Sequence, residues 1–330
     1  MDRDKIIKKF EEFNSKNILI IGDVMIDAYM WGDVNRISPE APVPIISVEK
    51  RENRLGGAAN VALNIKALGA NPIICSVIGD DDKGRIFTSL LQKRNITNEG
   101  IYISKNRITT TKTRIISQAQ HLLRVDEETS DVLQKQIEKD FLAQIIKIID
   151  SKKIDAIIFE DYDKGVITEN IIYTIVNLAN KKNIFTSVDP KKRNFLLYKA
   201  VSLFKPNLKE MLEGLKIDID KTNKEEIFDT VKILQEKLNA KYVFTTLSEL
   251  GVYIRSAEEG KYFPAIIRQI ADVSGAGDTV ISVATLCLCV GMNISEIAYI
   301  SNLSGGIVCE KVGVIPIEKN ILIKNISLNA

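Results

Sequence analysis

Short apolar runs alternate with helical patterns along most of the chain. The apolar runs predict β-strands, and they lie at residues 17–22, 73–79, 156–160, 184–189, 201–205 and 242–246. Apolar residues recur three and four positions apart between these runs, which is typical of amphipathic helices, at residues 61–68, 131–150, 168–181 and 224–238. This alternation predicts βα units around a mostly parallel sheet.

Two stretches break the alternation. Residues 27–50 contain Trp31, three prolines and a strand-like run at 45–49, whereas residues 101–125 show a threonine-rich two-residue alternation without a helix. We expect the two stretches to pair into a small sheet outside the main one, where they form a lid. No repeat, low-complexity tract or long Gly/Ser linker divides the sequence, so we expect a single domain over residues 1–330.

Composition narrows the function classes. Of the 330 residues 45% are hydrophobic, and the net charge of +2 is scattered, so nothing predicts a nucleic-acid partner. Residues 1–13 are charged and amphipathic and do not resemble a signal peptide, from which we expect a cytoplasmic protein. The longest apolar run, at 280–290, is about half of the roughly 20 residues that a membrane span needs, so it predicts a buried helix. A further helical pattern covers 294–313.

Cysteine and histidine offer little reactive chemistry. The cysteines lie in apolar segments without the spacing of a zinc site, and we expect reduced core thiols at Cys75, Cys287, Cys289 and Cys309. His121 is the only histidine and cannot supply both a catalytic triad and a metal cluster. Catalysis is therefore expected from carboxylates, backbone amides and a metal held by phosphates.

A loop of small residues at 272–279 (Asp-Val-Ser-Gly-Ala-Gly-Asp-Thr) runs directly into the apolar helix. Its Gly-Ala-Gly turn lets successive N–H groups point into one space, and a helix start behind them favours an anion. Asp278 then lies where a carboxylate can accept a proton from a hydroxyl that attacks a phosphoryl group. A tight turn with Asp278 as helix N-cap explains the same residues, and the loop alone leaves both interpretations open.

A second small-residue segment, at 55–61 (Leu-Gly-Gly-Ala-Ala-Asn-Val), also leads into a helix. Gly56 and Gly57 allow the backbone to approach a ligand closely, and Asn60 can exchange hydrogen bonds with sugar hydroxyls. A structural turn explains the segment equally well. No Walker A ending and no Gly-x-Gly-x-x-Gly after the first strand is present, which removes support for two other nucleotide-binding classes.

These two segments and Asn207-Leu-Lys-Glu210 together resemble the signatures of the PfkB or ribokinase family, in the right order and separation. The resemblance covers nearly the whole chain. It is sharpest to the kinase portion of bacterial ADP-heptose synthesis enzymes, over residues 22–27, 36–44, 56–62, 161–165, 189–191 and 272–280. The run at 36–44 (Arg-Ile-Ser-Pro-Glu-Ala-Pro-Val-Pro) is the most restrictive of these stretches.

The resemblance implies a ribokinase-like three-layer α/β/α fold with a mostly parallel sheet and a small β-sheet lid. It implies a sugar kinase that uses ATP and Mg²⁺ to phosphorylate the anomeric hydroxyl of D-glycero-D-manno-heptose 7-phosphate in ADP-heptose and lipopolysaccharide biosynthesis. Lid sheets in this family often pair between subunits, so a homodimer is expected. A kinase for another sugar or a nucleoside stays open, as does a non-catalytic nucleotide-binding regulator.

The resemblance also suggests roles for individual residues. Asp278 is expected to be the base, with an anion hole made by the amides of Gly275, Ala276 and Gly277. The sugar is expected to contact Asp23, Asp27, Gly56, Gly57 and Asn60. Candidate cations for the sugar's phosphate are Lys191, Lys192, Arg114 and Arg124. The nucleotide side is expected to comprise Asn207, Glu210, Thr246, Ser248 and Gly251, with Glu210 holding Mg²⁺ through water. Capping and turn formation are an alternative explanation for Asp23 and Asp27, and surface solvation is an alternative explanation for the cations.

Two departures from that branch concern substrate details rather than phosphoryl transfer. Asp27-Ala28-Tyr29 stands where the branch often has Asp-Arg-Tyr, and Asp189-Pro-Lys-Lys192 stands where it often has Asp-Pro-Lys-Gly. Many relatives also carry a nucleotidyltransferase with a His-x-Gly-His element. This sequence has one histidine and ends at Ala330, so we expect that second activity to be absent.

Overall fold

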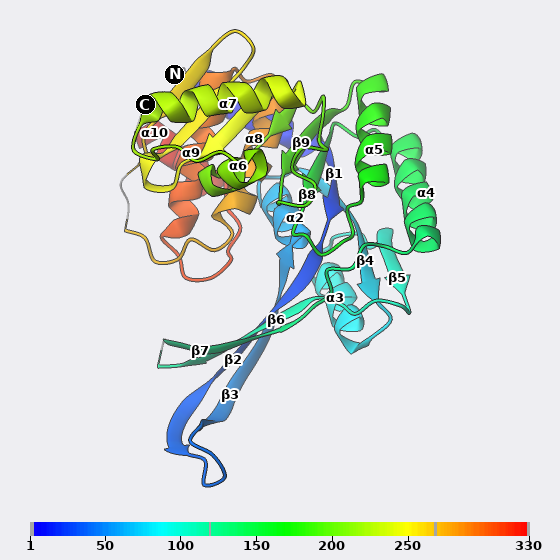
Figure 1. Ribbon diagram of the computed structural model, residues 1–330, viewed down its shortest axis with the longest axis vertical. Helices are drawn as coiled ribbons and strands as arrows, with labels where there is room; N and C mark the ends of the chain where they lie inside the picture. The colour runs from blue at the N-terminus through cyan, green and yellow to red at the C-terminus, as the bar shows by residue number, and fades with distance from the viewer. Residues whose placement is uncertain (1–2, 119, 267–268, 329–330) are drawn as a thin grey trace.

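The predicted strands assemble into a nine-stranded sheet (Figure 1). The computed structural model describes residues 3–118, 120–266 and 269–328. The sheet has the order β13-β12-β11-β10-β9-β8-β1-β4-β5. All neighbours from β11 to β5 are parallel, and β12 and β13 are added antiparallel. The bounds are β1 (Asn17–Gly22), β4 (Asn71–Gly79), β5 (Gly100–Ser104), β8 (Ala156–Glu160), β9 (Phe185–Asp189), β10 (Leu203–Phe204), β11 (Tyr242–Thr246), β12 (Val252–Arg255) and β13 (Gly260–Phe263).

Helices cover both faces of this sheet and give three layers. Successive residues of β1 point to opposite faces, so Ile18 and Ile20 join one core whereas Leu19 and Ile21 join the other. The first core is closed by α1 (Arg3–Glu12), α2 (Ala58–Ala67), α3 (Asp82–Lys93), α8 (Ala276–Cys289), α9 (Ile294–Cys309) and α10 (Lys319–Leu328). The second is closed by α4 (Lys135–Ser151), α5 (Glu169–Lys181), α6 (Leu208–Leu215) and α7 (Lys224–Leu238). Short 3₁₀ turns lie at η1 (Phe13–Ser15) and η2 (Ser248–Leu250).

A second sheet projects from this body as a long arm (Figure 1). It has the order β3-β2-β6-β7 and is formed by β2 (Val24–Ile37), β3 (Pro44–Gly57), β6 (Thr111–Ser117) and β7 (Gln120–Glu127). Only the β2–β6 pair is parallel. The small sheet expected from the two unusual stretches is therefore present. One part of that expectation is wrong, because residues 101–104 pair with β4 as strand β5 of the main sheet.

The observed elements follow the sequence pattern closely, with corrections at their ends. The strand expected at 201–205 shrinks to Leu203–Phe204, and at its carboxyl end Pro206 has no N–H to extend the ladder. The helix expected from 280 begins four residues earlier, at Ala276. The cysteines are free in the part of the chain that is described. Within the same ranges, none of the helices combines the length and apolar character needed to cross a membrane.

Candidate functional site

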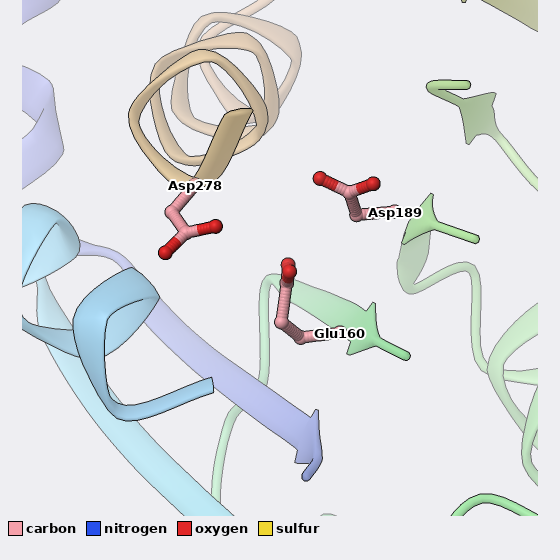
Figure 2. A group of neighbouring side chains, drawn as sticks. All are labelled: Glu160, Asp189 and Asp278. Atoms are coloured by element: carbon pink, nitrogen blue, oxygen red, sulfur yellow. The ribbon is translucent and has the colours of Figure 1, made fainter. Parts of the chain in front are cut away.

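Charged side chains converge at the carboxyl ends of the parallel strands. Glu160 is the last residue of β8, Asp189 is the last residue of β9, and Asp23 follows directly after β1. The start of α8 points at the same edge and brings Asp278 to the two strand-end carboxylates (Figure 2). Ligands of open α/β sheets bind outside the carboxyl ends of their strands, so this edge is the candidate active site.

Asp278 lies in the first turn of α8 and is only 6% exposed. Its Oδ2 accepts a hydrogen bond of 2.6 Å from Asn60 Nδ2, and its Oδ1 accepts one of 2.9 Å from the Tyr162 hydroxyl. Burial raises the pKa of Asp278 to about 6, and the hydrogen bond from Asn60 opposes the rise. The carboxylate is thus poised to exchange a proton near neutral pH, which is the range that suits a general base.

The loop before α8 has the shape expected of an anion site. Gly275 adopts φ +78°, and a Cβ there would lie 3.0 Å from Asn60 Nδ2, so a larger residue would strain the turn. The Ala276 N–H donates to Val273 O at 3.3 Å, while the next amides belong to the helix start, which lacks partners within the helix. A Cβ on Gly277 would lie 3.5 Å from Asp189 Oδ2. The loop therefore lies directly over the charged edge of the sheet.

Glu160, Asp189 and Asp278 form a buried carboxylate cluster whose facing oxygens lie within 4.8 Å of one another (Figure 2). Lys205 pairs with Asp189 at 2.7 Å, with both side chains almost fully buried. Among the described residues, Glu160 Oε2 is buried without a hydrogen-bond partner. Burial and the charges of Asp189 and Asp278 raise the pKa of Glu160 well above its usual value. The ammonium groups of Lys205 and Lys191 oppose this rise in pKa but do not outweigh burial and the neighbouring carboxylates, so a proton on Glu160 relieves the remaining repulsion.

This cluster predicts that Glu160→Gln stabilises the folded protein at neutral pH. A raised pKa in the folded state means that stability is lost as pH rises from the unfolded pKa of Glu160 towards the folded one. The glutamine has no such loss, so its melting temperature should exceed that of the parent at about pH 7.5 and approach it near pH 4. Each kcal/mol of relieved repulsion corresponds to roughly 2 °C. For the exposed control Glu213→Gln we expect the melting temperature of the parent at both pH values. The same result for Glu160→Gln would refute the repulsion.

Asp23 serves the fold rather than an open pocket. It is 1% exposed, and its carboxylate accepts backbone N–H groups from Tyr162 at 2.9 Å, Lys164 at 3.1 Å and Val166 at 3.1 Å. Burial raises the pKa of Asp23 to about 6 even against these donors. The contacts favour the capping alternative for Asp23, since both of its oxygens are already used inside the protein.

The expected sugar residues other than Asp23 line a pocket of about 230 Å³. Gly56 lies against Asp27, where a Cβ would approach Oδ2 to 2.2 Å, and Gly57 adopts φ +60° at the start of α2. Asp27 pairs with Arg114 at 2.5 Å. The pocket wall comprises Met25, Asp27, Gly56, Gly57, Asn60, Lys112, Arg114, Arg124, Tyr162, Ser274, Gly275, Asp278 and Val314. A larger hollow of about 810 Å³ lies at the amino ends of β1 and β4, away from these groups.

Three cations reach this pocket from the small sheet. Lys112 and Arg114 come from β6, and Arg124 comes from β7. Lys112 also pairs with Asp126 at 2.9 Å. Of the cations expected from the sequence, Arg114 and Arg124 are therefore at the pocket, whereas Lys191 pairs with Glu210 and Lys192 is exposed.

The expected nucleotide residues lie along the neighbouring strand ends. Asn207 is the N-cap of α6 and forms a capping box with Glu210, with hydrogen bonds of 2.8 and 2.9 Å. The other oxygen of Glu210 accepts from Lys191. Thr246, at the end of β11, forms a bridge with Asn207. Ser248 and Gly251 form the turn before β12, where the Gly251 N–H donates to Ser248 O at 3.0 Å.

Several residues of the site were absent from the sequence-based expectations. Glu160, Asp189 and Lys205 end or directly follow strands, and polar residues at that position are a signal that could have identified them. Tyr162 lies in the 161–165 stretch that carries the resemblance, but its contact with Asp278, like the place of Lys112 at the pocket, depends on how distant segments fold together.

Comparison with known proteins places this geometry in a family. The description "pfkB family carbohydrate kinase" fits residues 15–320. Bifunctional protein HldE from Helicobacter pylori (strain J99) is 39% identical over 298 residues, which cover 90% of this chain and 64% of that protein. Bifunctional protein HldE from Aliarcobacter butzleri (strain RM4018) is 40% identical over 297 residues, covering 90% and 61%. The chain spans less than two thirds of the length of these curated relatives.

Solved structures share the fold at low identity. The structure of phosphofructokinase-2 from Escherichia coli in complex with potassium has a TM-score of 0.77 and 16% identity, covering 95% of this chain and 98% of that one. Arabidopsis thaliana ribokinase complexed with ribose and ATP has a TM-score of 0.71 and 15% identity, covering 94% and 99%. These similarities confirm the expected ribokinase-like α/β fold. Since the family match extends over nearly the whole sequence, the chain belongs to the pfkB family of carbohydrate kinases and is a sugar kinase.

Proposed function

We propose that this sugar kinase transfers a phosphoryl group from ATP to the anomeric hydroxyl of D-glycero-D-manno-heptose 7-phosphate, giving the 1,7-bisphosphate for ADP-heptose and lipopolysaccharide biosynthesis in the cytoplasm. The observation that carries the proposal is a buried carboxylate at a helix start, Asp278, at one pocket with three cations. The similarity to HldE proteins and the restrictive run at 36–44 favour the heptose over other sugars.

Asp278 would take the proton of the attacking hydroxyl, because its carboxylate faces the pocket and has a pKa of about 6 through burial. The amides of Gly275, Ala276 and Gly277 would stabilise charge on the transferred phosphoryl group, as N–H groups at a helix start do. Positioning and charge stabilisation are the main tasks of a protein in phosphoryl transfer.

The nucleotide side fits a metal bound through water. Both oxygens of Glu210 already have partners, Lys191 and the Asn207 N–H, so this carboxylate suits an outer contact better than a direct metal bond. Mg²⁺ prefers oxygen ligands and keeps several of its waters. When bound with ATP, the ion would offset the negative charge of the phosphates. Thr246, Ser248 and Gly251 would then border the adenine.

An ADP-release assay over a panel of sugars tests the proposal. Heptose 7-phosphate should give the highest kcat/KM under one ATP–magnesium condition. A higher value for ribose, a nucleoside or fructose 6-phosphate would leave a kinase of the same family for another substrate. No turnover with any of these substrates would favour the non-catalytic regulator, although such a protein has no need of a buried base beside an anion site.

We expect the small sheet to act as a lid. Closure over the pocket would exclude water from the transferring phosphoryl group. It would also slow the hydrogen exchange of the backbone amides in β2, β3, β6 and β7. Hydrogen-exchange mass spectrometry at saturating sugar should therefore show slower exchange over residues 27–50 and 111–125 than without sugar. The α5 and α7 segments, away from the lid, serve as internal controls. Unchanged exchange over both lid segments would identify the sheet as fixed structure.

The same sheet offers a surface for a homodimer. Ile115, Leu123 and Val125 share one face, and Leu123 is 58% exposed while Val125 is 42% exposed. A second copy of this sheet would cover these side chains. We expect a dimer by light scattering, and Leu123→Glu should shift it to the monomer, whereas Leu122→Glu, on the opposite face of β7, should shift it less. A monomeric parent protein would contradict this assembly.

A further inference from the structure

The segment at 161–166, between β8 and α5, is held firmly although it has no regular secondary structure. Three of its N–H groups donate to Asp23, as described above. Asp161, the first residue of the segment, accepts hydrogen bonds from Asn194 at 2.9 Å and from the Tyr198 hydroxyl at 2.8 Å. Arg107 donates to the carbonyls of Lys164 and Asp131. Hydrogen bonds to Asp23, Asn194, Tyr198 and Arg107 thus fix this short loop along its whole length.

What this loop presents to the site is Tyr162. Its N–H is fixed by Asp23, and its hydroxyl donates to Asp278 Oδ1 at 2.9 Å. The ring lines the same pocket as Asp278. With Asn60 on Oδ2 and Tyr162 on Oδ1, each oxygen of the carboxylate is oriented by one donor, and the two donors come from α2 and from the loop.

Charged groups face Asp278 from the other side. Glu160 from β8 and Asp189 from β9 disfavour a negative charge on it, whereas Lys205, after β10, favours one. The two hydrogen-bond donors act with Lys205, because a donor to a carboxylate stabilises its ionised form. Asp278 thus lies between groups that raise its pKa and groups that lower it.

We propose that Tyr162 is a positioning residue, which orients the ionised Asp278 carboxylate for proton transfer, and that the 161–166 loop is built to hold it there. This inference rests on the proposed role of Asp278. Its effect on turnover would be exerted through Asp278, whose Oδ1 accepts the hydrogen bond of the Tyr162 hydroxyl.

Tyr162→Phe tests the proposal, since it keeps the ring and removes only the hydroxyl. Loss of a hydrogen bond to a charged group should move the acid limb of the kcat/KM profile upward by about one pH unit. The value of kcat/KM should therefore fall about 5-fold at pH 6 and nearly 10-fold at pH 5, and it should recover at high pH, with KM for the sugar changed little. The matched control is Tyr198→Phe, which removes a hydroxyl that donates to Asp161 of the same loop. This hydroxyl does not contact Asp278, so the control should leave the acid limb unchanged.

A second measurement needs no turnover. The ¹³C carboxyl resonance of Asp278, assigned by its loss in Asp278→Asn, should titrate about one unit higher in Tyr162→Phe than in the parent. An unmoved acid limb and resonance, with a raised sugar KM, would make Tyr162 a substrate contact and overturn the proposal. An equal shift in Tyr198→Phe would assign the effect to the loop as a whole. Full activity of Asp278→Asn would instead show that Asp278 is not the base, independently of the result for Tyr162→Phe.

Discussion

Asp278→Asn is expected to lower turnover at least about 100-fold, the low end for a positioned general base. Asparagine keeps the shape of the side chain and can still pair with Asn60 and Tyr162, but its amide cannot take the proton of the attacking hydroxyl. ATP binding should stay nearly unchanged, because the expected nucleotide residues lie along β11 and α6. Steady-state turnover and calorimetric ATP titration on the same sample measure both effects.

A matched control for this substitution is Asp82→Asn. Asp82 is also an aspartate in the first turn of a helix, α3, but its side chain is 88% exposed and pairs with Arg85 at the surface. Turnover of this control should match the parent. If Asp278→Asn retains turnover within a few-fold of the parent, Asp278 is the helix cap that the sequence also allowed and the base lies elsewhere.

Arg114→Ala is expected to reduce kcat/KM for the phosphorylated heptose by about 100-fold and to affect the unphosphorylated heptose far less. A pocket cation that meets a phosphate is worth roughly 3 kcal/mol when the pair is sheltered from water. The side chain of Arg114 is 18% exposed, and it lies at the pocket with Lys112 and Arg124. The ratio of kcat/KM for the two sugars, measured for parent and variant, reports this effect directly.

Two variants sharpen that experiment. Lys191→Ala should change both sugars alike, since Lys191 pairs with Glu210 on the nucleotide side. Arg114→Ala also leaves Asp27 without its partner, so Asp27→Asn combined with Arg114→Ala separates loss of phosphate binding from loss of the ion pair. An unchanged ratio of the two sugars in Arg114→Ala would remove Arg114 from phosphate recognition.

The elements that local pattern controls were predictable from the sequence. Strands β1, β8 and β11 and helix α7 begin and end at the expected residues, because a buried parallel strand needs a continuous apolar run and an amphipathic helix needs its period. Strand β5 was assigned to the wrong sheet. The sequence of its five residues does not indicate which strand they pair with, because pairing with β4 depends on the tertiary fold.

The candidate site was predictable by residue type but only partly by contact. Asp278 and Asn60 were both expected, yet their bond joins positions 218 residues apart in the chain. Lys191 and Arg114 were equivalent as sequence candidates, and only the fold separates them, one to Glu210 and the other to Asp27. A sequence pattern shows which side chains are available, whereas charge pairing depends on which strand ends become neighbours.

The inner end of the β2–β3 arm forms its joint with the main body, where both strands contact α2 and α3. One residue, Asp23, separates β1 from β2, while β3 leads directly into α2, and the Ala58 N–H donates to the Asp23 carbonyl at 3.0 Å across the joint. Strands of 14 residues reach about 45 Å, so the tip of the arm lies far from the end that joins the main body. A tilt that swings the tip widely moves Asp27 and Gly56 only slightly. Insertions or new partners at the tip can therefore change without disturbing the pocket floor.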